Sequence, residues 1–450
     1  MLNNIKLITQ KLGIDRAISF TLVTQLLTTA RNVVAIVLVI KFLTATEQGF
    51  YYTFTSILAI QIFFELGFSG IITQYAAHEV ANLRWDANVL TGNEVHQSRL
   101  NSLLHLTTKW FSVMAILLLI TLLIGGFVFF YYFAPKHEEV DWQWPWAMMA
   151  TTTALSLMVS AALAFYEGLG KVESVAKLRF YSLFVTTTVF FTSLCLGAKL
   201  YAYAFTNIAG LSVSTIWLFS PFVKKTFSHI WNYKIRLHII SWRKEIFPYQ
   251  WKIALSWMSG YFLFQLFNPI LFSTVGPKPA GQMGITQAAL SGVFGLANSW
   301  FSTKVPIFSG YIARKEYKML DIVFNRTIKQ ALFVMLSCLF VLFSFYTLFH
   351  FYKLDMVERF LPYIPFLLLA LASVTLFITN AMATYLRCHK EEPYLVASVC
   401  SGIVNLSLMP YTSKHYGITG MILGYLLIVI MGLIWGYCIF VNKKKQWHAL

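Results

Sequence analysis

Long apolar runs alternate with short polar connections along the whole chain. A window of about 20 apolar residues has the length needed to cross a bilayer as a helix. Such windows occur at 17–42, 50–77, 110–133, 144–168, 178–197, 200–222, 251–275, 282–309, 327–351, 360–386, 394–412 and 417–441. The pattern therefore predicts an all-α integral membrane protein with about twelve transmembrane helices, and the shortest separation falls near Lys199.

Lysine and arginine gather on one side of the predicted membrane. With the N-terminus inside, the cytoplasmic segments hold 26 of the 35 Lys and Arg residues and the outer loops hold 7. An excess of Lys and Arg in cytoplasmic loops sets the orientation of most membrane proteins. The count therefore predicts that both termini are cytoplasmic. It also explains the net charge of +17, because the positive side chains face anionic lipid headgroups and not nucleic acid.

The composition agrees with this class. Hydrophobic residues make up 58% of the chain, charged residues make up 12%, and the mean hydropathy is +0.64. Soluble domains carry about 25% charged residues, so this chain is suited to lipid. The predicted outer loops are short, and no nucleophile–base arrangement, zinc motif or phosphate-binding glycine loop occurs. We therefore expect no catalytic residue, no metal and no cofactor.

A basic segment at the middle of the chain divides it into two halves. Residues 224–252, "KKTFSHIWNYKIRLHIISWRKEIFPYQWK", mix Trp, Ile and Lys as an interfacial helix does. Gly49 and Gly281 each open the second helix of their half, which indicates a weak internal repeat of the kind seen in secondary transporters. The expected domains are an N-terminal six-helix bundle at 1–223, a basic cytoplasmic linker at 224–250 and a C-terminal six-helix bundle at 251–450.

Polar side chains follow one face of several predicted spans. These stripes contain Thr24, Gln25, Thr28, Arg31 and Asn32 on the first span, Gln61, Glu65, Ser69 and Thr73 on the second, Gln265 and the break Asn268-Pro269 on the seventh, Gln287, Ser291, Asn298 and Ser302 on the eighth, and Thr375, Thr379 and Asn380 on the tenth. Together they indicate a shared polar interior. The alternative for each Ser, Thr or Asn is a hydrogen bond that only holds the helices together.

Three charged residues lie inside the predicted spans. Arg31 is near the middle of the first, where a charged side chain costs at least about 2.5–3.5 kcal/mol unless it faces protein or water. Glu65 lies near mid-membrane on the next span, so the two could form a structural ion pair. Lys304 lies close enough to the cytoplasmic end of its span for its long stem to reach the interface.

The segment "EQGFYYTFTSILAIQIFFELGFSGIITQYAAHE", Glu47 to Glu79, resembles the corresponding region of bacterial O-antigen and capsule polysaccharide flippases. These belong to the multidrug/oligosaccharidyl-lipid/polysaccharide exporter superfamily. The twelve-helix layout, the basic linker and the glycine that opens the second helix of each half extend the resemblance over the whole chain. The resemblance implies two six-helix bundles around a central cavity, with alternating access.

The resemblance also implies a substrate and its setting. The substrate is an oligosaccharide on undecaprenyl diphosphate, moved from the inner to the outer leaflet of the bacterial inner membrane. The implied partners are this substrate, membrane lipids, and a polysaccharide polymerase with its chain-length regulator. Glu65 would hold Arg31 in the empty site or carry the coupling proton. The expected substrate-binding residues are Arg31, Lys304, Asn32, Gln25 and Asn298.

Three alternatives stay open. A cation-coupled multidrug exporter of the same superfamily would use acidic groups, and the first span has none. A flippase of lipid-linked peptidoglycan precursor would have more than twelve helices. An integral-membrane polysaccharide polymerase or ligase would need a larger external loop; Glu138, Glu139 and Asp141 fit a solvated loop better than a pair of catalytic carboxylates.

Overall fold

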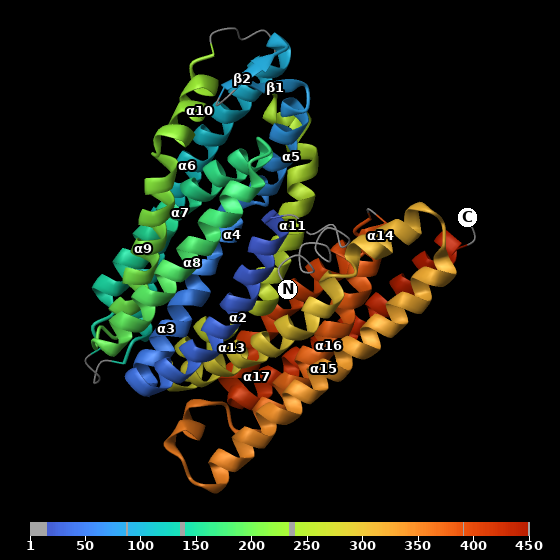
Figure 1. The fold of residues 1–450 in the computed structure, drawn as a ribbon. Coiled ribbons are helices and arrows are strands. Elements are labelled where there is room, and N and C mark those ends of the chain that lie inside the picture. Colours follow the sequence, from blue (N-terminus) through green and yellow to red (C-terminus); the bar gives the residue numbers. More distant parts are fainter. Residues whose placement is uncertain (1–15, 87–88, 136–139, 234–238, 390, 449–450) are drawn as a thin grey trace, which may run out of the picture. The chain divides into compact units, whose positions relative to one another are not determined.

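The computed structural model describes residues 16–86, 89–135, 140–233, 239–389 and 391–448, and most of these residues are helical (Figure 1). The helices are α2 (Arg16–Phe42), α3 (Ala45–Leu58), α4 (Ile62–Glu65), α5 (Phe68–Val80), α6 (Glu94–Phe133), α7 (Gln143–Gly168), α8 (Val172–Cys195), α9 (Tyr201–Leu218), α10 (Pro221–Trp231), α11 (Phe247–Phe264), α12 (Phe267–Thr274), α13 (Pro277–Ser302), α14 (Val305–Ala313), α15 (Tyr317–Phe351), α16 (Tyr363–Cys388) and α17 (Leu395–His448). Shorter elements are the helical turns η1 (Ala59–Gln61), η2 (Trp242–Ile246) and η3 (Asp355–Arg359) and the antiparallel hairpin of β1 (Leu83–Asp86) and β2 (Val89–Gly92).

The twelve predicted spans appear in order. Among the described residues, α6, α7, α8, α15, α16 and α17 are each long and apolar enough to cross a membrane, and two bent pairs qualify together. Gly417, with φ 63° and ψ −155°, interrupts α17 at the start of the last predicted span. With α2, α11–α12 and α13–α14 included, the predicted layout of twelve helices is confirmed.

Two spans of the second half break four residues before a proline. Pro269 would clash with the carbonyl of Gln265 and cannot donate to it, and α11 ends at Phe264. Pro306 has the same relation to Ser302, where α13 ends. The sequence places the seventh-span break at Asn268-Pro269; the helix actually breaks one turn earlier because the proline disturbs the preceding turn.

Two helices extend beyond their apolar windows into segments that the sequence predicts to be cytoplasmic. The third span begins at Glu94 rather than 110, and the ninth begins at Tyr317 rather than 327. Asn93 accepts a hydrogen bond from the backbone N–H of Val95 at 2.9 Å and so caps the start of α6. A hydropathy window detects only the part of a helix inside lipid, so it misses these polar extensions.

The contacts divide the chain into two compact units. The first contains residues 1–31, 58–132 and 141–257, and within it α5 packs on α7, while α7 and α8 pack on α9. The second contains residues 32–57, 133–140 and 258–450, and within it α16 packs on α17, and α13 packs on α12, α15 and α16. Residues 32–57 group with the second unit, so the units differ from the sequence halves. The division into six-helix bundles at 1–223 and 251–450 stays a prediction.

In the second unit, the glycines singled out by the repeat face each other. A Cβ on Gly49 would lie 2.0 Å from the carbonyl oxygen of Pro277, and one on Gly281 would lie 2.9 Å from the backbone nitrogen of Gly49. The buried Gln48 donates from Nε2 to the carbonyl oxygens of Gly281 (2.8 Å) and Arg359 (3.2 Å). Helices α3 and α13 therefore meet backbone to backbone at this crossing.

Candidate functional site

Arg31 lies in the middle of α2 and is half-buried. Its Nε atom is buried and has no hydrogen-bond partner among the described residues. A desolvated guanidinium nitrogen without a partner is costly, because the protein has removed its water without replacing the hydrogen bond. The Nε–H of Arg31 is therefore a donor that the described residues leave unused. The next residue, Asn32, is exposed, while the side chain of Gln25 lies outside the described part of the chain.

Glu65 stands at a break in the second span. It ends α4, and the next two residues, Leu66 and Gly67, adopt positive φ angles of 51° and 67° before α5 begins. The two parts of the span are bent by 42°. A Cβ on Gly67 would lie 2.4 Å from Cγ2 of Ile253, so glycine suits both the backbone and the packing. The break places a carboxylate beside the irregular backbone.

Arg31 and Glu65 do not meet in this state. Glu65 is half-buried, and among the described residues neither side chain forms an ion pair. The expected interaction between them stays a prediction, and the pairing does not account for the position of Arg31 here.

Asn298 belongs to a polar pair in the second unit. The Nδ2 of Asn380 on α16 donates to the Oδ1 of Asn298 on α13 at 3.1 Å. Both side chains are half-buried, so their other donors and acceptors stay available. The sequence placed both residues on polar faces, and the structure brings them together.

Lys304 occupies the break between α13 and α14. It precedes Val305 as the N-cap residue of α14, and its side chain is half-buried. No ion-pair partner of Lys304 exists in the described part of the chain. The break follows from Pro306, so this cation is set at a fixed position in irregular backbone, as Glu65 is in the first unit.

Other members of the polar stripes hold helices together. Thr73 donates to the carbonyl oxygen of Ala164 on α7 at 2.9 Å as well as to its own helix. Gln287 donates to the carbonyl of Phe264, which the end of α11 leaves free, at 3.3 Å. Thr375 and Thr379 donate to carbonyl oxygens one turn back on α16. For these four, interhelical or local hydrogen bonding describes the contacts.

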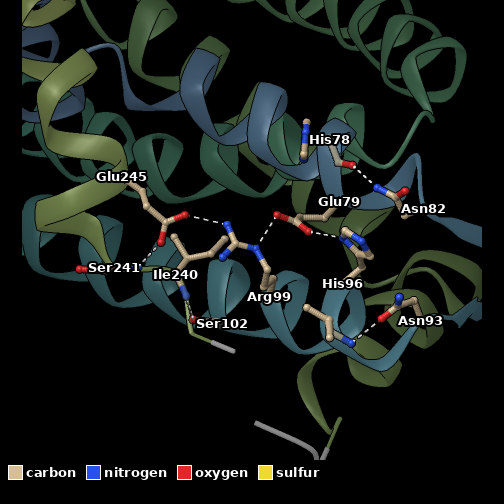
Figure 2. A network of polar contacts seen from close by, with 11 residues as sticks. His78, Glu79, Asn82, Asn93, His96, Arg99, Ser102, Ile240, Ser241 and Glu245 are labelled. Carbon is tan, nitrogen blue, oxygen red and sulfur yellow. Dashed lines mark hydrogen bonds and ion pairs between the residues drawn. The ribbon is translucent and has the colours of Figure 1, made fainter. Parts of the chain in front are cut away.

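A charged network that the sequence did not indicate lies in the first unit (Figure 2). Glu79, at the end of α5, is only 2% exposed, and its two oxygens contact His96 Nδ1 at 2.7 Å and Arg99 Nε at 2.8 Å. Arg99 also donates from Nη2 to Glu245 of η2 at 2.6 Å. Tyr75 donates to the backbone carbonyl of Glu245 at 2.7 Å. The network therefore fastens the linker segment before α11 to α5 and α6.

The charges of the network stabilise one another. Burial raises the pKa of Glu245, but the hydrogen bonds from Arg99 and from the Ser241 backbone N–H, together with the charge of Arg99, leave this pKa below its ordinary value. Burial lowers the pKa of Arg99, but hydrogen bonds and charge from Glu79 and Glu245 leave it raised. The sequence did not predict this network because charged residues beside a membrane are usually solvated. The available signal was an acid, Glu79, that ends an apolar run.

Glu245→Gln should loosen this attachment in a pH-dependent way. Glu245 has a lowered pKa in the folded protein, so its charge contributes fully above the ordinary value of 4.5 and is lost as the pH falls through the lower folded value. The variant should lose about 1 kcal/mol of stability at neutral pH, because one partly exposed ion pair is removed. Its deficit against the parent, followed by thermal melting of purified protein, should shrink as the pH falls below 4.5 and through the lower folded pKa of Glu245.

Glu316→Gln provides the control, because the Glu316–Arg314 pair is exposed on both sides. It should melt with the parent at every pH. A Glu245→Gln deficit that is equally large in acid would show that the lost contact does not depend on the charge of Glu245.

Comparison with known proteins identifies the fold. No family model and no curated protein sequence matches this chain. Among solved structures, the MATE multidrug transporter DinF-BH matches with a TM-score of 0.60 and 12% identity, over 97% of this chain and 96% of that one. Lipid II flippase MurJ, in an inward closed conformation, matches with a TM-score of 0.56 and 14% identity, over 96% and 89%. An inward-facing MATE family transporter of the MOP superfamily matches with a TM-score of 0.55 and 15% identity, over 89% and 94%.

These matches span nearly the whole chain at low identity. They show that it has the fold of the multidrug/oligosaccharidyl-lipid/polysaccharide (MOP) transporters, which agrees with the superfamily resemblance of the sequence. The matched proteins include both a drug transporter and a lipid II flippase, so the fold itself is common to both kinds of substrate.

Proposed function

We propose that this chain is a flippase that moves undecaprenyl-diphosphate-linked oligosaccharide repeat units from the inner to the outer leaflet of the bacterial inner membrane. Its fold is shared with MurJ, a flippase of lipid II. The twelve predicted spans and the excess of cytoplasmic Lys and Arg are in keeping with a multi-pass protein of that membrane. Alternating access is the transport mode that we propose with this fold.

The observation that carries this proposal is the state of Arg31. A diphosphate crossing the hydrocarbon layer needs its negative charge compensated, and a guanidinium offers forked hydrogen bonds to phosphate oxygens. Arg31 presents a guanidinium at mid-span whose Nε is desolvated and has no partner among the described residues. A ligand oxygen would supply the missing hydrogen bond. We assign Arg31 to the diphosphate on this basis.

The other expected site residues take supporting roles in the proposal. Lys304, at its helix break, supplies a second positive charge to the diphosphate during the transport cycle. Asn298, oriented by Asn380, offers hydrogen bonds of the kind that sugar hydroxyls use. We keep Asn32 and Gln25 as polar neighbours of Arg31 on α2 that contact the substrate. A polysaccharide polymerase and its chain-length regulator are the proposed partners that receive the product.

Reconstitution tests the proposal directly. Liposomes containing the purified chain should move undecaprenyl-diphosphate oligosaccharide from one leaflet to the other, measured as loss of access to an added glycosidase. Protein-free liposomes set the background rate. Equal rates with and without protein would overturn the proposal, provided that the protein is shown to be folded by size-exclusion chromatography.

A cation-coupled multidrug exporter is the second candidate. The MATE transporters that share the fold favour it, and so does one residue of this chain. Glu65 is a half-buried carboxylate with no ion-pair partner among the described residues, which leaves it able to bind a cation. The same carboxylate can carry a coupling proton in a flippase. A coupling role for Glu65 therefore does not decide whether the substrate is a drug or a lipid-linked oligosaccharide.

Glu65→Gln separates these roles. Because no described contact of the Glu65 side chain is lost, the variant should reach the membrane at normal abundance. If Glu65 couples transport to protons, polymer export should lose its dependence on external pH while drug sensitivity is unchanged. Increased drug sensitivity with normal polymer would favour the exporter.

Glu79→Gln is the matched control, since the carboxylate of Glu79 is buried and accepts from Arg99. Its abundance should fall, because the variant replaces a buried carboxylate that contacts both His96 and Arg99 with a neutral amide that cannot match both contacts. If Glu65→Gln lowers abundance as much as Glu79→Gln does, the role of Glu65 is structural.

A further inference from the structure

A cavity of 390 Å³ lies in the first unit, among α6, α7, α9 and α10. Helix α9 packs on α7 and contacts α10, and α6 is hydrogen-bonded to α10 through Asn101 (Figure 1). Most of its lining is apolar, including Phe111, Ala161 and Phe227, and Lys224 is the one charged residue among the described residues that line it. The cavity does not involve the residues assigned to transport.

Helix α10 presents two different faces. Val223, Thr226 and Ile230 are buried. Lys224, Phe227, Ser228 and Trp231, at helical spacings of three, four and seven, line the cavity. Since α10 is bent by 67° from α9 at Ser220, it can follow the membrane surface while α9 crosses the bilayer. The cavity face thus combines a cation, a hydroxyl and two aromatic rings.

Two contacts hold α10 in place. The buried Asn101 of α6 donates from Nδ2 to the carbonyl oxygens of Ile230 and Trp231, at 2.7 and 2.9 Å, and so satisfies the C-terminal end of α10. The ring of His105 stacks on Trp231 with centroids 3.8 Å apart. The cavity wall is therefore fixed before any ligand arrives, which reduces the entropic cost of binding.

The charge of the cavity comes from the N-terminal end of α10. Lys224 lies in the first turn of α10, where the helix N-terminus also favours an anion. The cavity therefore offers positive potential at Lys224 and the exposed hydroxyl of Ser228 beside a mostly apolar wall.

We propose that this cavity binds an anionic phospholipid of the cytoplasmic leaflet, with an acyl chain against its apolar wall and the phosphate on Lys224. A phosphodiester carries a single negative charge, which one lysine matches. A diphosphate carries more charge, and the described lining of this cavity offers no second cation. The ester oxygens of the lipid can accept from the Ser228 hydroxyl. The site anchors α10, and through Asn101 it stabilises the junction of α6 with the linker.

Native mass spectrometry of the detergent-purified chain tests this site. Phosphatidylglycerol should bind, and phosphatidylcholine should bind more weakly at equal concentration. Lys224→Gln should lower phosphatidylglycerol affinity about fivefold, the effect of one lysine on an anionic headgroup. Ser228→Ala, which removes the exposed hydroxyl of the cavity, should also weaken binding. Ala162→Phe, which fills the cavity from α7, should reduce binding of both lipids.

Lys225→Gln is the control, because Lys225 is exposed on the same helix but does not line the cavity. Equal losses for Lys224→Gln and Lys225→Gln would overturn the site in favour of diffuse attraction. Displacement of phosphatidylglycerol by equimolar undecaprenyl diphosphate would overturn the assignment to a phospholipid. Unchanged binding to Ala162→Phe, with normal elution on size-exclusion chromatography, would overturn the placement of the acyl chain.

Discussion

Arg31→Ala should abolish nearly all polysaccharide export while the protein still inserts at normal abundance. The substitution removes a half-buried guanidinium that has no ion-pair partner among the described residues and whose Nε makes no hydrogen bond there, so the fold loses little when the side chain is removed. The substrate, by contrast, loses a charge-assisted contact worth about 1.5–3 kcal/mol, or roughly ten- to a hundredfold in affinity. The measurement is the surface polymer restored to a strain lacking the gene, divided by protein in the membrane.

Arg31→Lys separates charge from geometry. Lysine keeps the positive charge but cannot make the forked contact with two phosphate oxygens, so partial activity is expected. Lys41→Ala is the matched control, because Lys41 is an exposed cation near the end of the same helix. It should export as the parent does. If Arg31→Ala restores as much polymer as Lys41→Ala at equal abundance, Arg31 does not bind the substrate.

The layout of the helices could be predicted from the sequence because lipid imposes a simple rule on composition. About 20 apolar residues are needed to cross the bilayer, and each predicted span corresponds to a helix, a bent pair or half of α17. The breaks were harder to place. A proline disturbs the turn before it, so the effect of Pro269 appears at Gln265, where the residue itself gives no signal.

The site was predictable only in part. Polar residues at helical spacing indicated Asn298 and Asn380 separately, and only the fold shows that they bond to each other. The network of Glu79, Arg99 and Glu245 could not be predicted, because its members are distant in sequence. Each of them has the sequence context of a solvated charge in a loop beside the membrane. In the folded protein these charges bond to one another and hold α5, α6 and η2 together. Hydropathy gives no sign that a polar segment will be buried in this way.

Gly49→Ala should strongly destabilise the protein, although alanine is the better helix former. Relative to glycine, alanine in a helix interior gains about 0.5–1 kcal/mol. At this position, however, the new Cβ would lie 2.0 Å from the carbonyl oxygen and 2.6 Å from the carbonyl carbon of Pro277. These are backbone atoms, which cannot rotate away as a side chain can. Helices α3 and α13 must separate, with an expected net cost of about 1–3 kcal/mol or more.

Gly70→Ala is the control, because it measures the effect of replacing glycine by alanine where the new Cβ meets no other atom. Gly70 lies in α5, the other part of the bent pair that begins with α3, and a Cβ there would meet nothing within 4 Å. Thermal melting of the detergent-purified variants should show Gly49→Ala lowered and Gly70→Ala unchanged or raised. Separation of α3 from α13 would also draw Gln48 away from the carbonyl of Gly281, leaving a buried amide unsatisfied and adding to the loss. If both variants melt with the parent, the backbone contact between Gly49 and Pro277 does not exist in the folded protein, and the pairing of the two repeat glycines must be abandoned.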